Sequence, residues 1–139
     1  YGGPGFVVDP GTAASFGVII SVGAYIGGAI SPGTGISLEA LGRRGAQLRK
    51  VELLRPRSVI AKNTVEAVQS GMVFGFASQI DGMVARMAEQ LAADPSELTV
   101  IATGGLASVV LHECNVITNH EPWLTLLGLE MVYRRNSPA

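Results

Sequence analysis

The sequence holds little charge, a single cysteine and two histidines. Charged side chains make up 15% of its 139 residues, and ten basic against eleven acidic residues leave a formal net charge of −1. Because no basic excess is present to attract a polyanion, nucleic acid is not an expected partner. Cys114 has no second cysteine with which to form a disulfide, and no set of Cys and His has zinc-binding spacing. The sequence therefore excludes a disulfide scaffold and a structural zinc site.

Apolar residues, in contrast, make up 47% of the sequence, which is enough to form a folded core. The length is that of one domain. The chain opens with the letters Y-G-G-P-G rather than with an initiator methionine, so we expect a fragment or a trimmed chain. Its opening does not read as a signal peptide, which would pair a basic segment with an apolar run, and we expect a cytoplasmic location.

The uncharged stretch at residues 10–38 is the part of the sequence that most resembles a membrane span. Its apolar centre, residues 16–30, is interrupted by glycines, whereas a spanning helix needs about 20 continuous apolar residues. We therefore expect two strands, Ser15–Val22 and Tyr25–Ser31, joined by a turn in which Gly23 takes a positive φ. A small membrane-associated protein is the alternative that this stretch leaves open.

Hydrophobic spacing predicts the remaining elements. Residues 64–92 repeat apolar side chains every three or four positions, as in a long helix, and Asn63 with Glu66 forms a variant of the capping box at its start. Three glycines, at 71, 75 and 82, weaken such a helix by about 1 kcal/mol each, so we expect close packing against it there. The other expected elements are strands Phe6–Asp9, Leu98–Ala102 and Val116–Thr118 and helices Ile36–Gln47, Leu106–Leu111 and Leu124–Arg134.

Together these elements predict an α/β fold in a single domain, residues 1–139. An antiparallel meander of three strands comes first, and helices and further strands follow it. The helix at residues 36–47 ends in a basic run that we expect to be solvated, formed by Arg43, Arg44, Arg49 and Lys50. Because this layered architecture hosts many activities, function has to be argued from the loops.

The loop Asp9-Pro10-Gly11-Thr12 follows the opening strand and has the residues of a phosphate-binding turn. Gly11 lets the backbone approach a ligand closely, and Thr12 offers a hydroxyl and an amide to a phosphate oxygen. The Asp9 carboxylate is suited to hold a cation, such as Mg²⁺ or K⁺, beside that phosphate. The alternative is a plain turn at the end of a strand, since Asp, Pro and Gly are common turn residues.

Two further loops combine glycine with hydroxyl side chains. Residues 27–35 have paired glycines and a Pro-Gly turn, so we expect another backbone or a ligand to lie close to them. Residues 102–105, Ala-Thr-Gly-Gly, lie between a buried strand and a helix, where helix amides bind anions or nucleotides. This segment lacks the lysine of a P-loop and the spacing of a dinucleotide fingerprint, which excludes both of those sites.

Six segments stand in a recognisable order: F-V-V-D-P-G-T-A, Y-I-G-G-A-I-S-P-G, S-L-E-A-L, R-P-R-S-V-I-A-K-N-T-V-E-A-V-Q-S-G, I-A-T-G-G and L-T-L-L-G-L-E-M-V-Y-R-R-N. In order and spacing they resemble the C-terminal half of type III pantothenate kinases, and the resemblance covers nearly the whole chain. It implies one of two ribonuclease-H-like halves that clasp ATP and phosphorylate pantothenate, the first step of coenzyme A synthesis. It also implies a homodimer.

The resemblance assigns roles to individual residues. Asp9 matches the aspartate that holds a monovalent cation, K⁺ or NH₄⁺, beside the phosphates of Mg²⁺-bound ATP, and Gly11 and Thr12 match the phosphate-contacting turn. Thr64 matches the threonine that contacts pantothenate. The alternative from the residues alone is that Thr64 only helps to start the long helix, and the two roles are compatible. The segment Thr103, Gly104 and Gly105 matches the part of the site near the adenosine.

The sequence also departs from the family pattern, which usually reads D-F-G-T-A-T-T-F-D in the first loop. Here Pro10, Ala14, Ser15 and Gly17 replace an aromatic residue, two threonines and the second aspartate. The family's D-x-G-N-T loop and its G-A-D-R segment, whose aspartate is the catalytic base, have no counterpart. We therefore expect no catalytic residue among these 139 residues, with the base upstream of Tyr1, and no activity from the chain alone.

The same departures leave a second interpretation open, in which a binding or dimerisation module has kept the fold and lost the chemistry. The remaining reactive side chains are expected to be structural. His112, Cys114 and His120 form no ligand pattern with a carboxylate pair. Trp123 is expected to form a staple or contact before the last helix. The remaining core candidates on the long helix are Met72, Phe76, Met83 and Met87.

Overall fold

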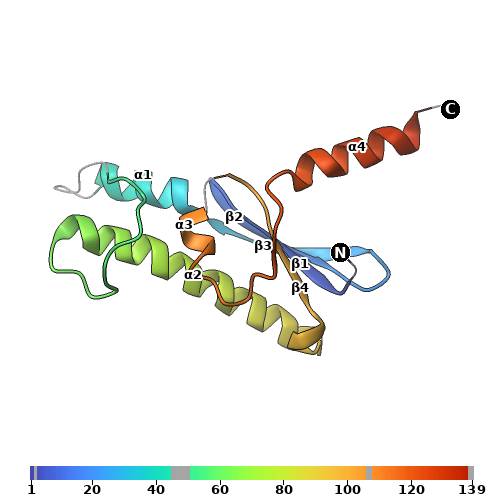
Figure 1. Ribbon diagram of the computed structural model, residues 1–139, viewed down its shortest axis with the longest axis horizontal. Coiled ribbons are helices and arrows are strands. Elements are labelled where there is room, and N and C mark those ends of the chain that lie inside the picture. The colour runs from blue at the N-terminus through green and yellow to red at the C-terminus, as the bar shows by residue number, and fades with distance from the viewer. Residues whose placement is uncertain (2, 45–50, 106–107, 138–139) are drawn as a thin grey trace.

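The computed structural model describes residues 1, 3–44, 51–105 and 108–137 and has a mixed α/β architecture (Figure 1). Its elements run β1 (Gly5–Pro10), β2 (Ala13–Ile19), β3 (Tyr25–Pro32), α1 (Thr34–Arg44), α2 (Thr64–Gln90), the 3₁₀ helix η1 (Pro95–Glu97), β4 (Thr99–Ala102), α3 (Ser108–Leu111), β5 (Asn119–His120) and α4 (Leu124–Asn136). The expected fold class, a three-stranded meander followed by helices and further strands, is confirmed.

The five strands form one sheet in the order β3-β2-β1-β4-β5. The pairs β1–β2 and β2–β3 are antiparallel, whereas β4 pairs in parallel with β1 and with β5. Because parallel strands end on the same side, the carboxyl ends of β1, β4 and β5 lie together. We call this side of the sheet the carboxyl edge.

The long helix α2 packs against one face of the sheet and completes the core (Figure 1). Burial alternates along β1 and β2, as expected for strands with one covered face. Phe6 and Val8 of β1 and Phe16 of β2 pack with Ile80 and Val84 of α2, and all of them are fully or almost fully buried. The expectation that the methionines and Phe76 of α2 belong to the core is confirmed.

The two strands expected in the uncharged stretch are present, but β2 ends at Ile19 rather than at Val22. The Ile20 amide donates to the Ala24 carbonyl, 3.0 Å away, so Val22 lies in the turn and is exposed. Gly23 has φ +79°, as expected for this turn. Among the helices in the described part of the chain, none is long and apolar enough to cross a membrane.

The start of α2 is capped as the sequence predicts, with one difference. Asn63 is extended, and its Oδ1 accepts a hydrogen bond of 2.9 Å from the Glu66 amide. The Glu66 carboxylate returns to the side-chain amide of Asn63, rather than to its backbone amide as expected. It also accepts from the Arg57 guanidinium, which ties the preceding segment to the helix.

The expectation of close packing at the glycines of α2 is wrong among the described residues. Apart from the helix's own backbone, no described heavy atom lies within 4 Å of a Cβ added at Gly71 or Gly75, and a Cβ at Gly82 would meet only the Arg86 side chain. Gly71 and Gly75 lie on the exposed face of the helix, away from the sheet.

The last strand is also displaced from its expected position: β5 is Asn119–His120, not Val116–Thr118. The Thr118 side chain accepts from the Val100 amide, and the regular parallel ladder begins only at the pair Ile101 and Asn119. Helix α1 starts at Thr34, two residues earlier than expected. Three parts of these expectations lie outside the described residues. They are the end of the helix expected at 36–47, the basic residues Arg49 and Lys50, and the first two residues of the helix expected at 106–111.

The final helix α4 is present where expected, yet it has no buried residue. Trp123, which precedes it, is 65% exposed and forms no side-chain hydrogen bond that caps the helix. The Trp123 side chain is therefore mostly exposed at the start of α4, which runs away from the sheet (Figure 1), and the staple or contact expected there stays a prediction.

Candidate functional site

Three loops meet at the carboxyl edge. They are the turn after β1, the segment that leads into α1 and the segment after β4. The first and third are adjacent because β1 and β4 pair in parallel, and the Thr103 amide continues the ladder by donating to the Val8 carbonyl at 2.9 Å. The chain thus brings together loops that are about ninety residues apart in the sequence.

The Asp9 carboxylate lies between two glycines of these loops. A Cβ built on Gly104 would stand 2.5 Å from Asp9 Oδ1, and one built on Gly11 would stand 3.2 Å from the same oxygen. Gly104 has φ +88°, a conformation that L residues with side chains rarely adopt. Both the space and the backbone conformation at Gly104 therefore require glycine, and the carboxylate is half-buried against it.

The turn after β1 is supported from behind by the start of α1. The Gly33 amide donates to the Thr12 carbonyl at 3.1 Å, and the Thr34 hydroxyl donates to the Pro10 carbonyl at 3.4 Å. A Cβ on Gly33 would overlap the backbone oxygens of Gly11 and Thr12. The sequence-based expectation that another backbone lies close to this second loop is confirmed. That the neighbour is the Asp9 turn was not predicted.

The opposite side of the turn is open. Thr12 is exposed and Gly11 is half-buried, so an amide and a hydroxyl are accessible beside the half-buried carboxylate. Helix α1 also begins here, and the first turn of a helix favours negative charge. A carboxylate with glycine backbone around it, an accessible hydroxyl and a helix start can together hold an anion and a cation side by side.

The structure brings together most, but not all, of the residues predicted to form the site. The carboxyl edge holds Asp9, Gly11, Thr12 and the segment 103–105. Within that segment Thr103 is buried and Gly105 is exposed. Thr64 is the exposed first residue of α2, and no hydrogen bond among the described residues joins it to this edge. In Figure 1 the start of α2 lies at one end of the molecule, away from the end of β1.

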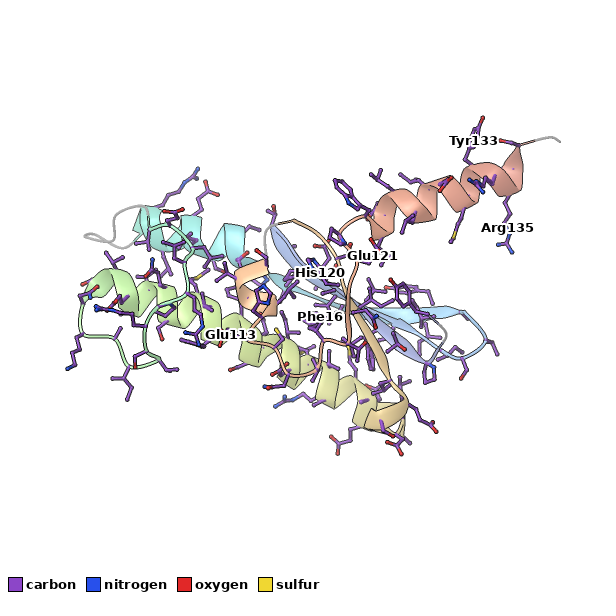
Figure 2. All side chains as sticks on the ribbon, in the orientation of Figure 1. Phe16, Glu113, His120, Glu121, Tyr133 and Arg135 are labelled. Atoms are coloured by element: carbon purple, nitrogen blue, oxygen red, sulfur yellow. The ribbon has the colours of Figure 1, made fainter. Side chains whose placement is uncertain are left out.

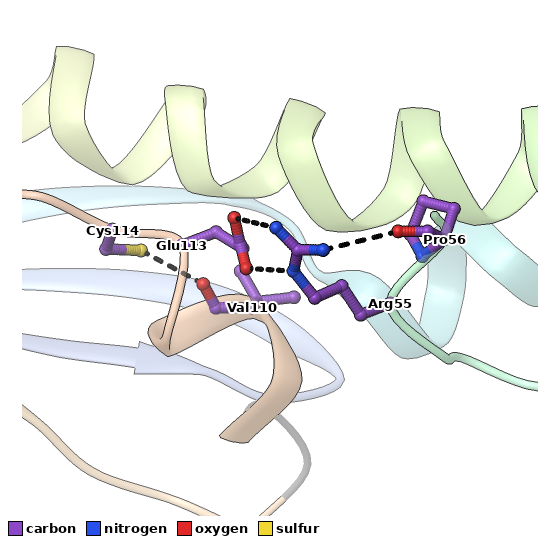
Figure 3. Close-up of polar contacts among 5 residues, drawn as sticks. All are labelled: Arg55, Pro56, Val110, Glu113 and Cys114. Atoms are coloured by element: carbon purple, nitrogen blue, oxygen red, sulfur yellow. Dashed lines mark hydrogen bonds and ion pairs between the residues drawn. The ribbon is translucent and has the colours of Figure 1, made fainter. Parts of the chain in front are cut away.

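A second set of contacts fixes the segment that leads to Thr64. Arg55 Nε and Nη2 donate to the two carboxylate oxygens of Glu113, which follows α3 (Figure 3). The Arg55 guanidinium also lies over the Phe74 ring, 5.6 Å from its centre. The Arg55 hydrogen bond holds the pKa of Glu113 below its ordinary value. Sequence reasoning missed this pair, since its partners are 58 residues apart and nothing local marks them.

The interpretation of Cys114 as a packed residue is consistent with its surroundings. Its thiol donates to the Val110 carbonyl (Figure 3), and burial raises its pKa to about 12, with a smaller contribution from Asp81 and Glu113. The thiol therefore stays protonated near neutral pH, unlike a catalytic nucleophile. Across the described ranges, no group of three or more His, Cys, Asp and Glu side chains is placed to hold a metal ion.

Comparison with known proteins identifies close relatives. The family described as Type III pantothenate kinase matches residues 1–86. A protein named Type III pantothenate kinase from Streptomyces griseus is 66% identical over 98% of this chain and 51% of its own length. A protein of the same name from Nocardioides sp. is 64% identical over 99% of this chain and 54% of its own. The chain spans about half the length of the curated relatives it matches.

The chain also resembles solved structures, among them the following one. It is a Campylobacter jejuni protein described as a Baf family transcriptional activator, with a TM-score of 0.66 and 19% identity. The similarity covers 96% of this chain and 58% of that one. At this identity it supports the fold alone.

Proposed function

The chain belongs to the type III pantothenate kinase family, and on that basis we propose that its carboxyl edge forms one wall of a cleft in which ATP phosphorylates pantothenate. The observation that carries the proposal is the convergence of Asp9, the Gly11–Thr12 turn and Gly104 at that edge. The other wall belongs to the part of the relatives' length that this chain does not match.

In this proposal the Gly11–Thr12 turn binds the phosphate chain of ATP. Its amides and the Thr12 hydroxyl face phosphate oxygens, and the start of α1 adds a favourable dipole. Thr103, Gly104 and Gly105 lie towards the adenosine, where glycine backbone leaves room for a flat base. Mg²⁺ accompanies the ATP substrate, as in other phosphoryl transfers.

The residues at Asp9 fit a monovalent cation. The carboxylate is half-buried and is enclosed by Gly104 and Gly11, whose missing Cβ atoms leave their backbone close to it. Oxygen atoms of this kind are the ligands that hard cations take in proteins. A K⁺ or NH₄⁺ ion held there supplies positive charge beside the phosphates.

Thr64 is proposed to contact pantothenate. It is exposed at the first position of α2, where a hydroxyl and free helix amides suit a carboxylate such as that of pantothenate. The Asn63 and Glu66 cap and the Arg55–Glu113 pair hold this end of the helix and the segment before it in place. Starting the helix and binding a substrate are compatible roles for this residue.

Calorimetric titration with ATP, Mg²⁺ and K⁺ tests the proposal. We expect heat of binding for the 139-residue chain and its loss, or a decrease of about tenfold in affinity, in Asp9→Asn, because one charge-assisted contact is removed. Asp94→Asn is the matched control, since Asp94 lies before β4 at the opposite end of that strand. Equal binding by wild type and Asp9→Asn would contradict the role of Asp9.

A second candidate function is a binding or dimerisation module without catalysis. The observation in its favour is at Gly17, where the family has an aspartate. A Cβ built on Gly17 would stand 3.3 Å from the Tyr25 ring, so the ring occupies the space into which the family's aspartate side chain would project. Ala14 does not add to this case, because it is completely buried in the core rather than open to a ligand. The module predicts a homodimer and no heat from ATP with any cation, so the same titration separates the two functions.

A further inference from the structure

Asp81, on the long helix α2, accepts hydrogen bonds from three donors on two successive residues that follow α3. Its carboxylate accepts from the Asn115 amide at 2.9 Å, from the Asn115 side-chain amide at 2.8 Å and from the Val116 amide at 3.2 Å. Successive backbone amides that point at one carboxylate form charge-assisted hydrogen bonds, which are stronger than those between neutral groups. The contact therefore fixes the segment 112–118, between α3 and β5, to the middle layer of the fold.

The segment 112–118 needs such an anchor because the strand that follows it is very short. β5 has two residues and pairs with β4 at two positions. Just before β5, the amide and the hydroxyl of Thr118 bond to the backbone of Val100. Among the described residues, Asp81 is the one α2 side chain that forms hydrogen bonds to the stretch 108–121. The position of this stretch relative to α2 thus depends on Asp81, together with the packing of α3.

The stretch 108–121 ends at the carboxyl edge. The Glu121 amide donates to the Ala102 carbonyl at 2.8 Å, and Ala102 directly precedes the segment 103–105. The other side of β4 is held by its parallel pairing with β1. In Figure 2 the labelled Glu113, just after α3, lies beside α2, whereas Glu121 lies near the start of α4. The chain after α3 therefore runs from α2 to the side of β4 that β1 does not hold.

The surroundings of Asp81 favour a role in positioning over a role in holding the core together. Asp81 and Val116 are half-buried and Asn115 is exposed, so none of the three is fully buried. When the carboxylate is removed, water can replace it as the acceptor for the two amides. The core residues next to it on α2, Ile80 and Val84, stay packed against the sheet. Loss of Asp81 is therefore expected to release the segment 112–118 without unfolding the chain.

We propose that Asp81 is a positioning residue for the nucleoside end of the cleft. It fixes the segment 112–118 on α2, and through β5 and Glu121 it sets the place of the segment 103–105. In the proposed function that segment lies towards the adenosine, and the inference rests on that function for the identity of the ligand. The Gly11–Thr12 turn, at the phosphate end, is supported by the start of α1 instead.

Two ligands that share a phosphate chain separate positioning from general damage. The 139-residue chain is titrated calorimetrically with ATP and with inorganic tripolyphosphate, each with Mg²⁺ and K⁺. In Asp81→Ala we expect the affinity for ATP to fall about tenfold or more, and the affinity for tripolyphosphate to stay within about twofold of wild type. Alanine is the best helix former, so α2 is kept, which circular dichroism of the variant verifies.

Two further variants control this comparison. Asp81→Asn keeps one oxygen for the backbone amides, and the Asn115 side chain can turn to pair with the new amide group, so its affinity for ATP recovers to within about threefold of wild type. Glu89→Ala removes the same charge from an exposed position on the same helix. The Glu89 side chain forms no hydrogen bond or ion pair in the described part of the chain, and both affinities are expected to stay unchanged.

Hydrogen exchange without any ligand tests the positioning itself. The amides of Thr118 and Glu121 pair with β4, and in Asp81→Ala they are expected to exchange about tenfold faster than in wild type. The amides of β1 and α2 keep their rates, because the core is unchanged. Asp81→Asn and Glu89→Ala exchange as wild type does at both sites.

Three results would overturn the inference. They are wild-type affinity for ATP in Asp81→Ala, an equal loss of affinity for ATP and tripolyphosphate, and unchanged exchange at Thr118 and Glu121. The exchange measurement also separates the inference from the proposed function. A wild-type chain that binds neither ligand, with faster exchange in Asp81→Ala, contradicts the function alone, whereas ATP binding with unchanged exchange contradicts the inference alone.

Discussion

Single glycines decide whether the carboxyl edge can form. Gly104 is the clearest case, because its positive φ and its proximity to the Asp9 carboxylate both exclude a side chain. Gly105, one residue later, has no described heavy atom within 4 Å of a Cβ added to it, apart from its chain neighbours. We therefore expect alanine to destabilise the fold at Gly104 but not at the adjacent Gly105.

Gly104→Ala is expected to lower the free energy of unfolding by about 1–3 kcal/mol, from the strained φ and the displaced carboxylate. Gly105→Ala, the matched control, is expected to stay within about 0.5 kcal/mol of wild type. Denaturant unfolding followed by circular dichroism measures both. Equal stability of the two variants would mean that Gly104 and Asp9 are not in contact.

At the scale of elements, the long helix α2 is less stable than its length suggests. Gly71 and Gly75 occupy exposed positions with open space around them, so no contact in the described chain compensates for their flexibility. A homodimer that covered this exposed face of α2 would provide such a contact.

Gly71→Ala is expected to raise the free energy of unfolding by about 0.5–1 kcal/mol, because alanine loses less backbone entropy in a helix. Thermal or denaturant unfolding of the monomeric chain measures it. A loss of stability on this substitution would show that something packs against Gly71, and would contradict its open environment.

The Arg55–Glu113 pair makes the segment before α2 sensitive to acid. The pKa of Glu113 is lowered in the folded state, so the pair contributes stability above the unfolded pKa of about 4.3 and loses it as pH falls through the folded value. We expect Glu113→Gln to be less stable than wild type at neutral pH and to approach wild type in acid. A difference that stays constant with pH would contradict this linkage.

Local signals explain which elements the sequence predicted well. The start of α2 follows from Asn63 and Glu66, which act within one turn of helix, and Gly23 marks its hairpin turn for the same reason. The position of β5 was missed because Thr118 bonds to Val100 through its side chain, across the sheet. The contact between Gly104 and Asp9 depends on parallel pairing, which hydrophobic spacing does not reveal.

At the scale of the whole molecule, the carboxyl edge is proposed to be one wall of a cleft. The site residues carried over from the resemblance were selected as separate loops, and the fold brings all of them except Thr64 to one edge. The exposure of α4 was not predictable from its sequence, since an apolar helix ordinarily indicates burial. Both findings direct attention to a partner surface.

The 139-residue chain alone is expected to give no phosphopantothenate when incubated with ATP, pantothenate, Mg²⁺ and K⁺. Phosphoryl transfer needs groups positioned on both sides of the phosphate chain, and in the proposed cleft this chain supplies one side. A coupled assay for ADP, with a direct assay for the product, measures this. Sustained turnover by the purified chain would contradict the account of a divided cleft.

The most direct test of the central claim is residue-resolved NMR of the backbone amides during titration with Mg²⁺-bound ATP in potassium buffer. The claim is that the turn after β1 binds the phosphates. It predicts the largest shifts at Gly11, Thr12, Gly104 and Gly105, and no shift at Gly23 in the β2–β3 turn. The claim would be contradicted if the amide shifts at the carboxyl edge stayed unchanged while ATP shifted amides elsewhere on the chain.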